Sequence, residues 1–223
     1  SDGTSAGTYL LADTSPGAET PRPEQIVSRL GQIFFHANDN LWRSDGTPAG
    51  TIQLSSFTSW PGGGFESNLL DSAELGGRLY YPASYDVGWE VYSTDGTVAG
   101  TYQYLNLETA PVTPLGGSSY PGEFLSHKGF VYFAGTVGTV RKLYRTNGSW
   151  GNTQPVTTGG LGFSTTKFHN LVVHNDAVHF TRHTISGWEL WKTDGSLAGT
   201  MSVEVNPAWV DHLVPGPGGS LLY

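Results

Sequence analysis

Three carboxylates are the residues of this sequence best placed for acid–base chemistry. Glu24, Glu123 and Asp211 each come shortly before a short apolar stretch, and Asn68 and Asn170 hold the matching place in two further stretches. If these stretches are strands around one axis, their polar residues form a ring at a channel mouth. Glycoside hydrolysis needs two carboxylates beside the scissile bond, so Glu24, Glu123 and Asp211 could supply them. A polar ring that only solvates the channel mouth is the commoner arrangement.

Aromatic side chains with polar neighbours form a second candidate site, for binding rather than catalysis. A flat aromatic face stacks on the apolar face of a sugar while nearby polar groups bind its hydroxyls. The stacking candidates are Trp60, Trp89, Trp188 and Trp209, and the hydroxyl-binding candidates are Asn68, Asp86 and Asn206. Packing between sheets is the alternative role for each tryptophan, because large aromatics are mostly buried.

Metal and cofactor chemistry is not expected. Four histidines cluster between His169 and His183, but His174 and His179 stand on either side of a predicted hairpin. His179 also takes the place of an aromatic residue in the repeat described below, so we expect it to pack rather than to bind zinc. There is no cysteine, and we find no phosphate-binding glycine loop and no hydrolase nucleophile motif. We therefore predict no cofactor.

One octet recurs along the chain and defines the repeat. It reads SDGTSAGT at 1–8, SDGTPAGT at 44–51, TDGTVAGT at 94–101, TNGSWGNT at 146–153 and TDGSLAGT at 193–200. A short apolar strand keeps the same rhythm and ends at Phe35, Tyr81, Phe133, Phe180 and Tyr223. Asp-Gly supplies the left-handed backbone that a tight turn needs, and the Asp side chain can accept hydrogen bonds from turn amides. Because every repeat carries the octet, we expect it to be structural.

Each repeat predicts four strands. An apolar stretch such as Ile26–Val27 or Leu69–Leu70 comes first, the apolar-aromatic strand second, a strand such as LWRS at 41–44 third, and the segment after the octet fourth. Trp42, Tyr92, Tyr144 and Trp191 recur in the third strand, where we expect core packing. Units of 43–52 residues with four strands are the pattern of a β-propeller. We predict an all-β, five-bladed propeller of antiparallel four-stranded blades, with residues 1–223 as one domain.

The segment ELWKTDGSLAGT at 189–200 resembles the ELWxxDGTxxGT, or hyalin-like, repeat of large exported bacterial proteins. The resemblance touches every unit and departs most at 146–153, where Asn147 replaces the Asp. It implies a secreted or surface-attached β-propeller, and it carries no catalytic residues over to this chain.

Composition and charge limit the partners. The net charge is −8 and the pI is about 5.2, which disfavours nucleic acid and anionic membranes. No apolar run approaches the length of a membrane span, so no membrane insertion is expected. The chain begins inside an octet and ends after a second strand, so joining its ends would give a fifth blade without a third strand. Either a piece of that blade is absent from this sequence, or the two ends belong to different blades of a longer array.

Function should lie in the loops that differ between repeats, since the shared parts build the scaffold. We expect a non-enzymatic extracellular module for binding or adhesion that recognises a glycan, on one propeller face. A structural or cell-surface-protein-binding repeat domain is the first alternative, and a glycoside hydrolase with carboxylates at the channel mouth is the second.

Overall fold

The computed structural model describes residues 1–15, 17, 23–55, 66–84, 88–107, 117–158, 167–205 and 212–222. Within these ranges the only helices are two short 3-10 turns, η1 (Trp150–Asn152) and η2 (Pro217–Gly219). All other regular structure there is β-strand. The all-β prediction is confirmed.

Antiparallel strands form five sheets, which we number as blades 1 to 5 in chain order. Blade 1 contains β1 (Glu24–Arg29), β2 (Gln32–Ala37), β3 (Asn40–Ser44) and β4 (Ile52–Gln53). Blade 2 contains β5 (Glu66–Ser67), β6 (Ala73–Leu75), β7 (Arg78–Ser84), β8 (Trp89–Thr94) and β9 (Tyr102–Leu105). Blade 3 contains β10 (Gly122–His127), β11 (Phe130–Val137), β12 (Val140–Thr146) and β13 (Gln154–Pro155). Blade 4 contains β14 (Lys167–His174), β15 (Ala177–Thr184), β16 (Gly187–Thr193) and β17 (Met201–Val205), and blade 5 contains β18 (Val214–Pro215) and β19 (Leu221–Leu222).

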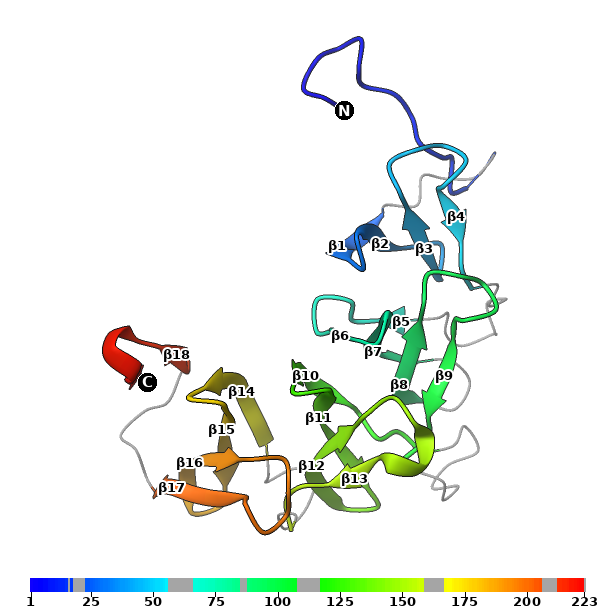
Figure 1. Cartoon of the computed structure of the whole chain (residues 1–223). Helices are drawn as coiled ribbons and strands as arrows, with labels where there is room; N and C mark the ends of the chain where they lie inside the picture. Colours follow the sequence, from blue (N-terminus) through cyan, green and yellow to red (C-terminus); the bar gives the residue numbers. More distant parts are fainter. Residues whose placement is uncertain are drawn as a thin grey trace.

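The blades follow one another along a curve, which gives a propeller-like arrangement (Figure 1). The first strands β1, β6, β10 and β14 lie on the inner side of the curve, and the fourth strands β4, β9, β13 and β17 lie on the outer side. The N-terminal segment and blade 5 stand at opposite ends, so the described residues form an open arc. This order confirms the predicted four-stranded antiparallel blade for blades 1, 3 and 4.

The octets connect the third and fourth strands, as predicted, and one hydrogen-bond network explains their sequence. In the octet at 94–101, Asp95 Oδ1 accepts bonds from the Thr97 N–H at 2.9 Å and the Thr97 hydroxyl at 2.7 Å. The Thr97 hydroxyl accepts the Gly100 N–H at 2.9 Å. A Cβ on Gly100 would lie 2.0 Å from Asp95 Oδ1, so the second glycine leaves the space that the carboxylate fills.

The same network recurs in the octets at 1–8, 44–51 and 193–200. Hydrogen bonds from the Thr97 side chain and N–H lower the pKa of Asp95, and the corresponding bonds lower the pKa of Asp2, Asp45 and Asp194. In the octet at 146–153 the Asn147 amide oxygen accepts only the Ser149 N–H, at 3.0 Å, and η1 follows. The expectation of a structural octet therefore fits its geometry.

The octets of blades 2, 3 and 4 also pack on the preceding blade. A Cβ on Gly195 would lie 2.5 Å from the Tyr132 hydroxyl of blade 3, and one on Gly148 would lie 3.0 Å from the Tyr80 hydroxyl of blade 2. Gly96 stands in the same relation to Phe34 of blade 1, at 3.8 Å. The first glycine of the octet thus permits close contact between blades as well as the turn itself.

Aromatic pairs form the core of each complete blade. The second-strand aromatic meets the recurring third-strand aromatic in every case: Phe35 with Trp42 at 6.2 Å, Tyr81 with Tyr92 at 6.3 Å, Phe133 with Tyr144 at 5.7 Å and Phe180 with Trp191 at 6.3 Å between ring centroids. Tyr92 and Tyr144 are buried, while Trp42 and Trp191 are half-buried. The predicted packing role of these four residues is thus met most fully in blades 2 and 3.

Two details of the first strands differ from the prediction. Leu69 and Leu70 form a turn rather than a strand, and the first strand of blade 2 is split around them into β5 and β6. In blades 1, 3 and 4 the polar positions lie inside the first strands rather than before them, at β-bulges where the pairing register shifts. Gln25, Glu123 and Asn170 have φ angles of 52°, 62° and 56° there. A bulge re-aims the side chains beside it.

Candidate functional site

Three of the seven predicted ligand-binding residues are among those described: Trp89, Trp188 and Asn68. The other four lie outside the described residues: Trp60, Asp86, Asn206 and Trp209. Trp89 and Trp188 hold equivalent positions in blades 2 and 4, since each stands five residues before the Thr that ends its third strand. Arg141 has that position in blade 3 and Asp39 in blade 1. The four equivalent positions therefore hold three different residue types.

Trp188 lies in a cluster of aromatic and ionisable side chains. Its ring centroid is 4.8 Å from that of His183, its cross-strand partner, and 5.8 Å from that of His169 on β14. His169 Nδ1 lies 3.6 Å from Glu123 Oε1 of blade 3. His169 and Glu123 keep 39% and 30% of their side-chain surface exposed, and Trp188 is half-buried. The structure thus brings the predicted Trp188 and Glu123 into one accessible cluster, linked by a histidine.

Glu123 is held in place by its neighbours in blade 2. Asp71 accepts the Glu123 N–H and the Phe124 N–H, both at 2.8 Å. Burial raises the pKa of the Asp71 carboxyl above its ordinary value, although these two bonds act in the opposite direction. The positive φ of Glu123 and the fixed carboxylate of Asp71 together determine where the Glu123 side chain points.

Arg141 lies near the Glu123 and Asp71 carboxylates. Its guanidinium donates to the Tyr120 carbonyl oxygen at 2.8 Å and to the Thr136 hydroxyl at 3.3 Å. Burial lowers the pKa of Arg141, and the nearby Glu123 and Asp71 carboxylates counteract that effect. The Tyr120 side chain is 48% exposed beside it. We call Glu123, Arg141, His169, His183 and Trp188 the Trp188 cluster.

Trp89 is half-buried, like Trp188, and its backbone is tied to the segment before blade 3. The backbone N–H of Trp89 donates to the Ser118 hydroxyl at 2.9 Å. The backbone carbonyl oxygen of Trp89 accepts the N–H groups of Ser119 and Tyr120 at 3.0 and 3.2 Å. The adjacent Glu90 is fully buried and accepts the Ser119 hydroxyl at 2.6 Å. These bonds anchor the start of β8, and the role of the Trp89 indole stays a prediction.

The remaining candidates are not members of the Trp188 cluster. Asn68 is exposed, and its side-chain oxygen accepts the Asp71 N–H at 3.4 Å. Glu24 is exposed at the start of β1, paired in register with His36. Gln25 carries no charge. Its side-chain oxygen accepts the Leu69 N–H at 2.8 Å, which links blade 1 to blade 2. Asp211 lies outside the described residues.

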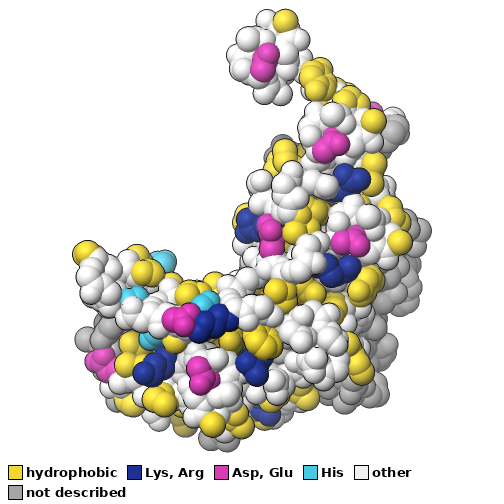
Figure 2. Space-filling view, in the orientation of Figure 1, with side chains coloured by type: hydrophobic (Ala, Val, Ile, Leu, Met, Phe, Trp, Pro, Cys, Tyr) yellow, Lys and Arg dark blue, Asp and Glu magenta, His cyan; other side chains and the backbone are white. Residues whose placement is uncertain are grey.

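Histidines gather over β14–β18 on the face shown in Figure 2. No group of three or more potential metal ligands occurs among the described residues. His179 is buried, 8% exposed, where Phe34, Tyr80 and Tyr132 stand in the other blades, and its ring contacts His174 edge-on at 5.4 Å. Burial lowers the pKa of His179. The packing role predicted for His179 is confirmed.

Comparisons with known proteins place few constraints on function. No family model and no curated protein matches the chain. Among solved structures, it is similar to TolB from Acinetobacter baumannii, with 12% identity, a TM-score of 0.49, and coverage of 89% of this chain and 47% of that one. A prolyl endopeptidase structure gives 10% identity, a TM-score of 0.46, and coverage of 84% and 27%. The chain thus spans less than half the length of either protein.

No helix among the described residues is both long and apolar enough to cross a membrane.

Proposed function

We propose that the protein is an extracellular, non-enzymatic binding module with the fold of a five-bladed β-propeller, and that it binds a neutral carbohydrate at the Trp188 cluster. The observation that carries this proposal is the contact chain from Trp188 through His169 to Glu123, whose members are all partly exposed. An indole can stack on a sugar ring while imidazole and carboxylate groups bind its hydroxyls. Secretion or display at the cell surface is part of the proposal.

The electrostatics favour a neutral sugar. The chain carries a net charge of −8, and Glu123 contributes a carboxylate within the cluster itself. A sialylated or sulfated glycan would approach against this field, at a cost that added salt reduces. Because the equivalent positions hold Asp39, Trp89, Arg141 and Trp188, we propose one dominant site with weaker sites at most, rather than five equal ones.

The test begins with an array of neutral and anionic glycans, followed by calorimetric titration of the best neutral ligand. Trp188→Ala should weaken binding by about 1–3 kcal/mol, as loss of a central aromatic contact does. Trp150→Ala is the matched control, because Trp150 lies in the octet of blade 3 and is 69% exposed. It should leave affinity unchanged, and both variants should keep the melting temperature of the wild type.

Three results would contradict the proposal. An array without binding would favour the structural or protein-binding role, and equal losses in both tryptophan variants would place the site elsewhere. Cleavage of a chromogenic glycoside that disappears in Glu123→Gln would replace a binding module with a glycoside hydrolase.

A further inference from the structure

We propose that the carbohydrate site continues from the Trp188 cluster to a second sugar subsite at Gly122, so that it takes a neutral oligosaccharide rather than a single sugar. In this subsite, Asp71 and Arg141 bind one hydroxyl group of the unit next to the stacked ring. The inference rests on the proposed function and names the class of carbohydrate. Asp71 belongs to blade 2, and Gly122 and Arg141 belong to blade 3.

Gly122 leaves a small space between a hydrogen-bond acceptor and a donor. A Cβ on this residue would lie 3.3 Å from Asp71 Oδ2 and 3.9 Å from Arg141 Nη2. Among the described residues, no other atom outside the chain neighbours of Gly122 lies within 4 Å of that point. An oxygen atom placed there needs only a small displacement to come within hydrogen-bonding distance of both groups.

A hydroxyl group is the ligand group that satisfies both partners. A hydroxyl donates one hydrogen bond and accepts others, so it can donate to the Asp71 carboxylate while it accepts from the Arg141 guanidinium. A carboxylate or sulfate group would be repelled by Asp71, and an ammonium group would be repelled by Arg141. The space between the two opposite charges therefore fits a neutral polar group.

Both partners are held by bonds to the backbone. Asp71 accepts the Glu123 N–H at 2.8 Å, and Arg141 Nη1 donates to the Tyr120 carbonyl oxygen at 2.8 Å. The Arg141 nitrogen nearest to the space at Gly122 is Nη2, so it is not the nitrogen that makes this bond. Because the two groups are already positioned, they lose little conformational freedom when a ligand binds.

The space at Gly122 is connected to the Trp188 cluster through Glu123. Glu123 follows Gly122 in β10, and its Oε1 lies 3.6 Å from His169 Nδ1. The His169 ring centroid is 5.8 Å from that of Trp188. Because the Glu123 and His169 side chains lie between the indole and the space, a ring stacked on Trp188 leaves the space unfilled. A hydroxyl of a neighbouring sugar unit must then supply the two bonds.

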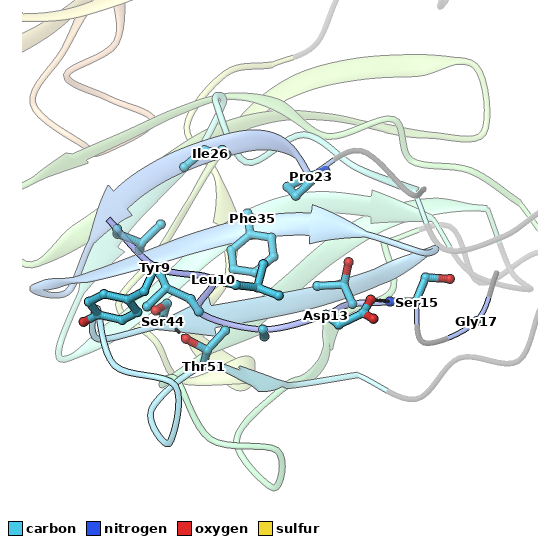
Figure 3. A pocket seen from close by; sticks show the side chains of 14 residues that line it. Tyr9, Leu10, Asp13, Ser15, Gly17, Pro23, Ile26, Phe35, Ser44 and Thr51 are labelled. Carbon is cyan, nitrogen blue, oxygen red and sulfur yellow. Dashed lines mark hydrogen bonds between the residues drawn. The ribbon is translucent and has the colours of Figure 1, made fainter. Parts of the chain in front are cut away.

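The cleft between the N-terminal segment and blade 1 has a different lining. It has a volume of about 640 Å³, and Leu10, Ile26 and Phe35 contribute to its wall (Figure 3). The described residues that line it are mainly apolar and include no Lys or Arg. Ile26 is 61% exposed there, so its truncation provides a control at a second cavity of the same protein.

Calorimetric titration with neutral sugars of increasing length tests the subsite. A glycan array carrying glucans, mannans, galactans, xylans and arabinans selects the series that binds best, and its monosaccharide, disaccharide and tetrasaccharide are then titrated. The wild type should bind the tetrasaccharide at least about tenfold more tightly than the monosaccharide, since hydrogen bonds to charged groups are strong.

Gly122→Ala is the principal variant, because its methyl group fills the space. The φ of Gly122 lies outside the left-handed region, so alanine adopts its backbone without strain. This variant should lose about tenfold in affinity for the tetrasaccharide and bind the monosaccharide as the wild type does. Arg141→Gln, which removes the donor and leaves the space open, should also weaken tetrasaccharide binding, and it replaces Gly122→Ala if that variant melts early. Gly151→Ala and Ile26→Ala are the controls and should bind every length like the wild type.

Four results would overturn the second subsite. Affinity that does not depend on length, while Trp188→Ala still weakens binding, would remove the subsite and leave the proposed carbohydrate site in place. Tighter binding of a uronic acid or sulfated oligosaccharide would mean that Arg141 binds an anion. Loss of affinity in Ile26→Ala would place the sugar in the cleft beside blade 1. An array on which no series binds would remove the subsite and the proposed function together.

Discussion

Replacing Gly100 by Ala tests whether the octet is built around its aspartate. The added methyl carbon would lie 2.0 Å from Asp95 Oδ1, so the carboxylate must move and release the Thr97 N–H and hydroxyl, which it holds at 2.9 and 2.7 Å. Two hydrogen bonds to a partly exposed charged acceptor contribute about 1–3 kcal/mol together. The free energy of unfolding, measured by urea titration, should fall by that amount.

A double-mutant cycle identifies the cause of the loss. In an Asp95→Ala background the methyl meets no carboxylate, so Gly100→Ala should add little to the cost of Asp95→Ala, and the two effects should be strongly non-additive. Gly151→Ala is the control, because a Cβ there has no neighbour within 4 Å. If Gly100→Ala is equally costly with and without Asp95, the carboxylate does not explain the second glycine of the octet.

Three further predictions follow from the same contacts. Trp191→Ala should lower the free energy of unfolding by about 3 kcal/mol, because the indole stacks on Phe180 and its Nε1–H donates to the Glu189 carboxylate at 2.8 Å. A loss smaller than that of Gly151→Ala would contradict this core role. Gly195→Ala should lower the melting temperature more than Gly46→Ala. Both glycines have a positive φ, at 95° and 90°, but only a Cβ at Gly195 would clash with the preceding blade. Equal decreases would mean that backbone strain alone causes the loss. In an acid titration, the free energy of unfolding should fall as the pH drops below 3.8. The reason is that the folded-state pKa of each octet aspartate lies below this ordinary value, so the stabilisation from its carboxylate is complete only above pH 3.8. A free energy of unfolding that does not change in this range would refute the network of Asp2, Asp45, Asp95 and Asp194.

Local features of the fold were predictable because they repeat. An octet such as 94–101 contains all the partners of its own network, from Asp95 to Gly100, so its turn can be inferred without knowing the rest of the molecule. His179 was assignable to packing by the same logic, because three other repeats hold an aromatic residue in its place. The four-stranded blade follows from the alternation of apolar and polar residues between these markers.

The candidate site depended on contacts between repeats, which spacing alone does not determine. The bulge that turns Glu123 toward His169 changes the register within a strand that reads as regular in sequence. No sequence pattern around Asp71 indicates that it holds Glu123, because it accepts backbone N–H groups of a blade about fifty residues further along the chain. Arg141 could have been placed by counting back from the octet, since it holds the position of Trp89 and Trp188.

The split first strand of blade 2 has a similar origin. Leu69–Leu70 is apolar enough to be a strand, but the Leu69 N–H is taken by Gln25 of the neighbouring blade and Asp71 turns toward the next. Bonds between blades therefore outweigh strand propensity there, as tertiary context often does.

Carbohydrate binding at the Trp188 cluster is most directly tested by the indole N–H signals of the protein in a nitrogen–proton correlation spectrum. The chain has 7 tryptophans, and Trp188→Phe identifies the Trp188 signal by its loss. During titration with the neutral glycan selected on the array, that signal should shift saturably with the calorimetric dissociation constant, while the Trp150 signal stays in place. Saturable binding that leaves the Trp188 signal unmoved would contradict the proposed site.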